Sequence, residues 1–133
     1  MLLRIITILI AAFLTLSGSA FAGGVTAPVS TPELKQTIGA NGKSTLVFFQ
    51  NPNGNPCKMQ KTILDKLYSD RKGNFNIAPV STTKQEDQKA FYDYGIRSLP
   101  SLVLVDKTGR IAQVFAPGIQ SIETLTSALN GLK

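Results

Sequence analysis

Short apolar runs alternate with longer amphipathic segments along most of this chain. Two runs contain no polar residue, 46–49 and 102–105. They predict strands over 44–50 and 101–106, because unbroken hydrophobicity is typical of strands covered on both faces of a sheet. Alternating polar and apolar residues predict a strand over 75–80. A tight turn at 107–109 leads into a fourth strand over 110–116, so the last two strands are expected to form an antiparallel hairpin.

Four segments carry helical signals. Thr31 and Pro32 supply an N-cap and a first helical residue for a short helix. A second helix is predicted over 56–71, a polar third helix over 83–94, and a last helix that Ser121 caps. Apolar residues of the second helix recur at helical spacing and predict its buried face: Met59, Ile63, Leu64, Leu67 and Tyr68.

The order of these elements defines the expected architecture. Strands and helices alternate through the first part of the chain, and a strand–strand–helix unit ends it. This order predicts the α/β class, with a mixed central sheet flanked by helices. The length of 133 residues is that of one domain.

The start of the chain follows a different pattern. Residues 1–4 include one positive charge, and residues 5–16 are apolar apart from threonine. Ala20 and Ala22 supply the small residues of an A-x-A cleavage site. The arrangement predicts a cleaved signal peptide over 1–22, and therefore an exported protein of a bacterial periplasm.

An uncleaved segment would instead anchor the protein to a membrane. A spanning helix needs about 20 apolar residues, which is longer than the apolar run, so contact with a membrane is expected only if cleavage fails. Residues 23–30 are small, polar and proline-containing and predict a flexible arm. The folded domain is then expected over 31–133.

Composition excludes several kinds of chemistry. The formal charge is +6, from 14 basic and 8 acidic residues. The basic residues are scattered, so a nucleic-acid partner is not expected. With no histidine and one cysteine, the chain alone cannot build a Ser-His-Asp or Cys-His pair, a His-ligated metal site or an internal disulfide. No cofactor and no metal are expected.

Three motifs occur in a characteristic order. The loop 53–58 reads Asn-Gly-Asn-Pro-Cys-Lys and opens a helix after an apolar strand. The segment 94–101, Tyr-Gly-Ile-Arg-Ser-Leu-Pro-Ser, precedes the next buried strand, and the hairpin over 102–115 follows. Together these pieces resemble the thioredoxin family, and the resemblance covers residues 44–132.

The resemblance implies a thioredoxin-like fold, a cis-proline at Pro100, and exchange with thiols or disulfides of proteins and peptides. The triplet at 56–58 resembles the end of the family's Cys-Gly-Pro-Cys-Lys active site, so Cys57 matches its second cysteine. The first cysteine of the family falls on Gly54, and the buried acid that the family often has falls on Phe48. The attacking thiol and its proton acceptor are therefore missing.

Cys57 is the candidate catalytic residue. Asn55 is a suitable N-cap and Pro56 a suitable first helical residue, which would place the sulfur beside free backbone N–H groups. This position favours a thiolate, whereas burial opposes it. Residues expected to contact a substrate around the sulfur are Gly54, Asn55, Pro56, Leu99 and Pro100.

A single thiol has limited chemistry. Cys57 can form a mixed disulfide that an external thiol resolves, or it can join two copies of the chain in a homodimer. It cannot perform the internal release step of a Cys-x-x-Cys pair. Two hypotheses follow, an exported thioredoxin-like protein in single-thiol exchange, and a redox-inactive module of the same fold that binds a peptide or protein. In the second, Cys57 is a small buried apolar residue.

Overall fold

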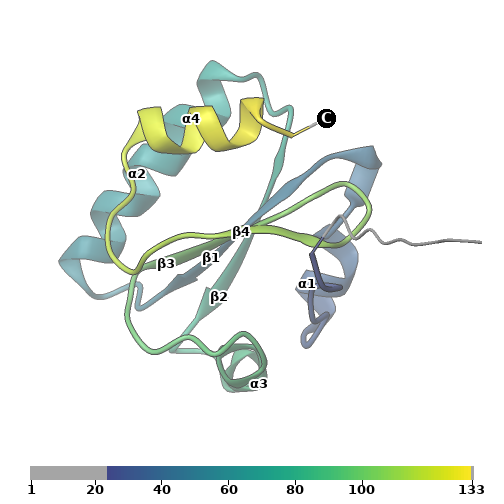
Figure 1. Ribbon diagram of the computed structural model, residues 1–133. Helices are drawn as coiled ribbons and strands as arrows, with labels where there is room; N and C mark the ends of the chain where they lie inside the picture. Colours follow the sequence, from purple (N-terminus) through teal and green to yellow (C-terminus); the bar gives the residue numbers. More distant parts are fainter. Residues whose placement is uncertain (1–23, 133) are drawn as a thin grey trace, which may run out of the picture.

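The computed structural model describes residues 24–132, so the predicted signal peptide lies outside the described residues. Four strands form one mixed sheet in the order β2-β1-β3-β4. β1 (Thr45–Gln50) pairs in parallel with β2 (Asn76–Ser81) and antiparallel with β3 (Ser101–Val105). β4 (Ile111–Val114) completes an antiparallel hairpin with β3. Figure 1 shows the mixed α/β architecture that the sequence predicts.

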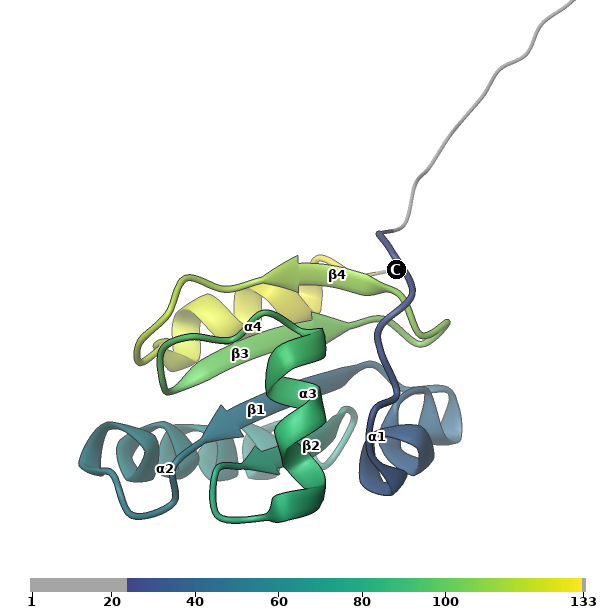
Figure 2. The ribbon, with the colours of Figure 1, turned by 90° about the horizontal axis from the view of Figure 1, so that it is seen from below.

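Helices cover both faces of the sheet. α2 (Asn55–Asp70) and α4 (Ile122–Asn130) pack on one face. α1 (Pro32–Thr37) and α3 (Gln88–Asp93) pack on the other, where Figure 2 shows α3 crossing in front of the strands. Two short 3-10 turns at Ala40–Gly42 and Gln85–Asp87 precede β1 and α3.

The central strands are buried from both sides, as the unbroken apolar runs predict. Leu46 and Phe48 of β1 belong to the core beneath α2 and α4. Val47 and Phe49 belong to the core beneath α1 and α3. Successive side chains of a strand point to opposite faces, so a strand with helices on both faces must be apolar at every position.

Several element boundaries differ from the predictions. The polar helix expected over 83–94 is a 3-10 turn followed by α3, because its first residues are exposed and bury no apolar side chain. On α2 the buried face is turned by one residue from the predicted one. Met59 is 58% exposed, whereas Gln60 is fully buried.

Residues 24–30 are attached to the domain and do not form the flexible arm that composition suggests. Thr26 forms an isolated bridge with Arg110. The Ala27 N–H donates to the Gly109 carbonyl at 2.8 Å, and Ala27 is buried against the core. The segment lies beside the β3–β4 turn and then leads into α1 (Figure 2).

Side chains of α3 and the following residue hold the same segment. The Tyr94 hydroxyl donates to the Pro28 carbonyl at 2.6 Å, and burial together with the nearby Asp93 charge raises the pKa of Tyr94 to about 12. The Ser30 hydroxyl donates to Asp93 at 2.5 Å. These tertiary contacts are absent from any local pattern of the sequence, which explains why composition alone suggests an arm.

β2 lies at the edge of the sheet and presents few free donors. The N–H groups of Asn76 and Thr82 donate toward β1. In a parallel strand the N–H groups alternate in direction, so those of residues 77, 79 and 81 point away from β1 toward the open edge. Pro79 has no N–H. The Ser81 N–H donates to the buried Asp87 carboxylate at 2.8 Å. This edge is therefore poorly suited to pairing with another strand.

Replacing Asp87 tests this edge. Asp87→Ala leaves the Ser81 N–H without its partner, so we expect the free energy of unfolding to fall by about 1–3 kcal/mol, measured by urea denaturation. Glu86→Ala, at the exposed neighbouring position, is the control and should change stability by less than about 0.5 kcal/mol. Equal losses in the two variants would contradict the assigned role of Asp87.

Candidate functional site

The site lies where β1 ends and β3 begins. Phe49 pairs with Ser101 at the last position of the antiparallel register. The next residues, Gln50 and Pro100, therefore come to the same end of the sheet. The loop that leads into α2 follows Gln50 directly, so strand pairing brings the start of α2 and the segment before β3 to one place.

α2 begins one residue earlier than predicted. Gly54 is the N-cap, with φ −85° and ψ 137° and no side-chain cap. Its N–H donates to the Asn51 carbonyl at 2.9 Å, and its carbonyl accepts from the Lys58 N–H at 3.0 Å. Asn55 is thus inside the helix and does not cap it, and Cys57 occupies the third helical position.

Cys57 is 2% exposed. Its Sγ accepts a hydrogen bond from the Asn51 N–H at 3.3 Å, and the loop is closed further by the Asn53 N–H donating to the Asn51 side chain at 3.1 Å. The sulfur is therefore buried and bonded to the loop that precedes α2. A reagent reaches the sulfur only after a local opening that exposes it.

Gly54 leaves room above the helix start. A Cβ atom at this position would lie 3.5 Å from the Asn51 carbonyl oxygen, which is an ordinary van der Waals contact. The backbone has a negative φ, so an L side chain is accommodated there without strain. The absence of a side chain at Gly54 is therefore a feature of the sequence and not a requirement of this backbone.

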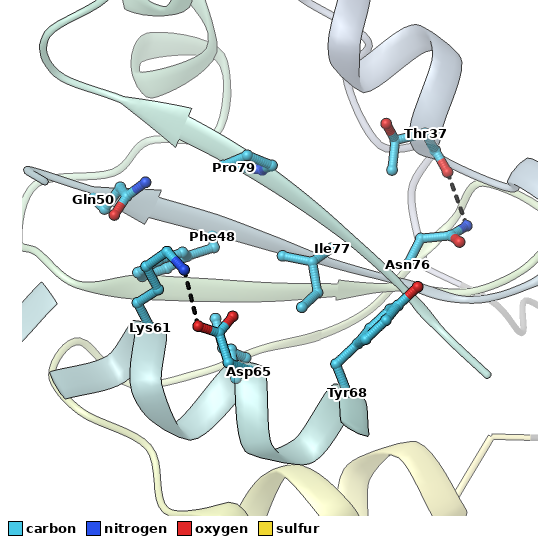
Figure 3. A pocket seen from close by; sticks show the side chains of 10 residues that line it. Thr37, Phe48, Gln50, Lys61, Asp65, Tyr68, Asn76, Ile77 and Pro79 are labelled. Carbon is cyan, nitrogen blue, oxygen red and sulfur yellow. Dashed lines mark hydrogen bonds and ion pairs between the residues drawn. The ribbon is translucent and has the colours of Figure 1, made fainter. Parts of the chain in front are cut away.

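Phe48 occupies the place beneath the helix where the resemblance puts an acid. It is buried and pairs across the strands with Pro79. Figure 3 shows both side chains in a groove of about 430 Å³ between the sheet and α2. The charged groups there, Lys61 and Asp65, bond to each other at 2.9 Å. Phe48 has no group that accepts a proton, so the missing acceptor is replaced by apolar surface.

The segment before β3 is held by its own contacts. The Leu99–Pro100 peptide bond is cis. Pro100 is buried, and its carbonyl accepts from the Gly118 N–H at 2.9 Å. Leu99 packs against the core beneath α1 and α3, and Ser101 Oγ donates to the Ser98 carbonyl at 2.6 Å.

Gln60 is a site-proximal residue that the sequence patterns missed. It lies one turn after Cys57 on the buried face of α2, which consists of Cys57, Gln60, Leu64 and Leu67. A glutamine among leucines at spacings of three and four residues was the available signal. Residue type favours Met59, one position away, for an apolar face, so the local pattern alone does not identify Gln60 as buried.

Two negative findings apply to residues 24–132. Within that range, no three side chains of the metal-ligating types gather closely enough to hold a metal ion. None of the helices described there has the length and hydropathy that crossing a membrane requires.

A mixed sheet, a helix that begins at a Pro-Cys pair and a cis-proline before the next strand define a thioredoxin-like class of protein. Residues 32–133 match the family described as a thioredoxin-like domain. The chain belongs to this family.

Similar proteins support the same assignment. Thioredoxin of Pyropia yezoensis is 28% identical over 102 residues, which cover 77% of this chain and 92% of that protein. A solution structure of an uncharacterised thioredoxin-like protein from Clostridium perfringens has a TM-score of 0.65 at 22% identity, covering 81% of this chain and 82% of that one. Fasciola hepatica thioredoxin has a TM-score of 0.57 at 17% identity, covering 69% and 83%.

The chain is therefore a redox-related protein of the thioredoxin fold. Members of this family generally act on protein thiols and disulfides. In this chain the sheet, the helix start and the proline segment are present, whereas the first cysteine and the buried acid are replaced by Gly54 and Phe48.

Gly54→Cys is expected to create a working dithiol. Residue 54 is the N-cap and Cys57 lies three positions later, within the span that a disulfide bridges. We expect both thiols to disappear on mild oxidation, as measured by thiol titration and mass spectrometry. Release of substrate then becomes intramolecular, so reduction of a protein disulfide should accelerate at least about tenfold.

Asn55→Cys is the matched control. A side chain two residues from Cys57 on the same helix does not face it, so this variant should keep two titratable thiols under the same conditions. If Gly54→Cys also kept two thiols, the backbone at the start of α2 would differ from the one described.

Proposed function

We propose that this protein is exported and exchanges disulfides with protein or peptide thiols through Cys57. The observation that carries the proposal is the position of Cys57, the only cysteine of the chain. It lies in the first turn of α2, at the sheet end that also holds Leu99 and Pro100.

The proposed reaction has two balanced steps. The Cys57 thiolate attacks one sulfur of a substrate disulfide, forming a mixed disulfide and releasing the other sulfur as a thiolate. An external thiolate then attacks the substrate sulfur of the mixed disulfide and returns Cys57 as a thiolate. The electrons come from the external thiol, and the substrate disulfide is the oxidant.

The residues around the sulfur have distinct proposed roles. Asn55 and Pro56 are exposed beside Cys57 and would contact the substrate. Gly54, the half-buried N-cap without a side chain, would give the incoming sulfur its path once the site has opened. Leu99 and Pro100, on the facing segment, would contact the substrate chain on either side of its cysteine.

Burial sets the rate of this chemistry. Because the Asn51 N–H bonds to Sγ and the sulfur is 2% exposed, exchange requires a local opening that breaks this hydrogen bond and exposes the sulfur, and the loop that holds Asn51 is the nearest segment that could move. Local opening of a short loop costs less free energy than global unfolding. The proposed exchange is therefore slow and limited to partners that stabilise the open loop.

The same burial favours a second candidate function. A sulfur covered by its own loop can serve as a packing residue, and the domain can bind an extended polypeptide at the Leu99–Pro100 segment with no electron transfer. The loss of the attacking thiol at Gly54 and of a proton acceptor at Phe48 agrees with this redox-inactive binding module.

Alkylation distinguishes the two functions. With iodoacetamide at neutral pH, we expect native Cys57 to react about tenfold to a hundredfold more slowly than in urea, which corresponds to an opening cost of about 1.4–2.8 kcal/mol. A cysteine-containing peptide disulfide should then form a mixed disulfide that is absent in Cys57→Ser and lost on reduction. Non-reducing electrophoresis of the same samples would detect a Cys57-linked homodimer.

The opposite result is equally clear. Suppose that native Cys57 reacts with iodoacetamide no faster than the whole protein unfolds, and that Cys57→Ser still binds the peptide in the presence of reductant. Single-thiol exchange is then wrong, and the binding module remains.

Export is a separate part of the proposal. It rests on the charged start, the apolar run and the small residues at Ala20 and Ala22. N-terminal sequencing of the protein from the periplasm of a bacterial host is expected to begin at Gly23. A sequence that begins at Met1 in the membrane fraction would replace export with membrane anchoring.

A further inference from the structure

Gln60 makes two hydrogen bonds to one backbone unit. Its Oε1 accepts from the Gln120 N–H at 2.6 Å, and its Nε2 donates to the Gln120 carbonyl at 3.1 Å. Gln60 is fully buried. A primary amide satisfies both groups at once because it carries a donor and an acceptor, which leucine or glutamate at neutral pH does not.

The segment that Gln60 holds reaches the other side of the site. Within the segment 116–120, the Gln120 side chain donates to the Ala116 carbonyl at 2.7 Å. Two residues before Gln120, the Gly118 N–H donates to the Pro100 carbonyl at 2.9 Å. A continuous set of hydrogen bonds and short backbone links thus joins the helix of Cys57 to Pro100.

The placement of this connection is specific to the site. Gln60 lies one turn beyond Cys57 on α2, and Pro100 directly precedes β3. α2 and β3 also share an apolar core that includes Leu64 and Leu102, and the Gln60 connection adds directional hydrogen bonds to that packing. A buried amide bonded at both ends costs little to bury, but losing either bond leaves a polar group unsatisfied. The connection therefore has one preferred geometry.

We propose that Gln60 is a positioning residue that fixes the distance between the Cys57 helix and the Leu99–Pro100 segment through the segment 116–120. This inference rests on the proposed function, because it assigns that distance to the binding of an extended polypeptide. The amide oxygen and nitrogen of Gln60 bond Gln120 and not the reacting sulfur. Gln60 acts on substrates that contact both sides of the site and not on small reagents that contact only the sulfur.

The experiment compares two aryl disulfides in single turnover with the full chain. One is a short alanine-rich peptide whose single cysteine is joined to an aryl thiol by a disulfide bond. The other is the symmetric aryl disulfide without a peptide. The Cys57 thiolate attacks the peptide sulfur, or one aryl sulfur of the small reagent, and releases an aryl thiolate that absorbance follows.

In Gln60→Leu, we expect the rate with the peptide disulfide to fall about tenfold, the loss that one to two hydrogen bonds would produce. The rate with the small aryl disulfide should stay within about twofold. The same substitution at an exposed glutamine, Gln36→Leu, should change neither rate. Equal changes of both rates in Gln60→Leu would overturn the proposal, since general loosening affects both reagents.

Amide hydrogen exchange gives a readout that is independent of the chemistry. In Gln60→Leu, the amides of Gln120 and Gly118 should both lose protection, while those of β1 keep it. Loss at Gln120 with full protection at Gly118 would overturn the inference, because Gln60 would then not reach Pro100. If the unmodified protein reacts with neither disulfide, the proposed function fails, and this measurement alone decides the role of Gln60.

Discussion

Antiparallel pairing of β1 with β3 is the constraint on which the site depends. The register that sets Phe49 opposite Ser101 brings the loop before α2 and the residues before β3 to one end of the sheet. The loop then closes over the helix start through Asn51, whose N–H reaches the sulfur of Cys57. Without this pairing, Cys57 and Pro100 would be two unrelated motifs, 43 residues apart in number but with no common surface.

The chain keeps the thioredoxin framework and changes the groups that would make it a dithiol enzyme. Gly54 removes a thiol from a position whose backbone accommodates a side chain. Phe48 places an aromatic ring opposite Pro79 where an acid would sit. Both changes are local and leave the sheet and helices intact, because the backbone hydrogen bonds of α2 and β1 do not depend on which side chains stand at these two positions. The thioredoxin-like fold thus forms here without the family's pair of cysteines.

Gln60 illustrates how a polar residue can belong to an apolar face. Its neighbours along the buried face of α2 are Leu64 and Leu67, and burying a glutamine there is tolerated because both ends of its amide are bonded. Asp87 follows the same rule at the edge of the sheet, where its carboxylate accepts from Ser81. Gln60 joins segments that are 60 residues apart, whereas Asp87 joins β2 to the 3-10 turn that follows it, six residues away.

The sequence by itself determined what depends on local patterns. Unbroken apolar runs identify the two central strands, Thr31 and Ser121 cap the helices as expected, and the motifs around Cys57 and Pro100 indicate the family. Tertiary structure decided what depends on distant partners: the attachment of residues 24–30, the phase of α2 that buries Gln60 and exposes Met59, and the depth at which Cys57 is buried. Spacing along a chain reports which residues can share a face, whereas exposure and hydrogen-bond partners are set by segments that no local window contains.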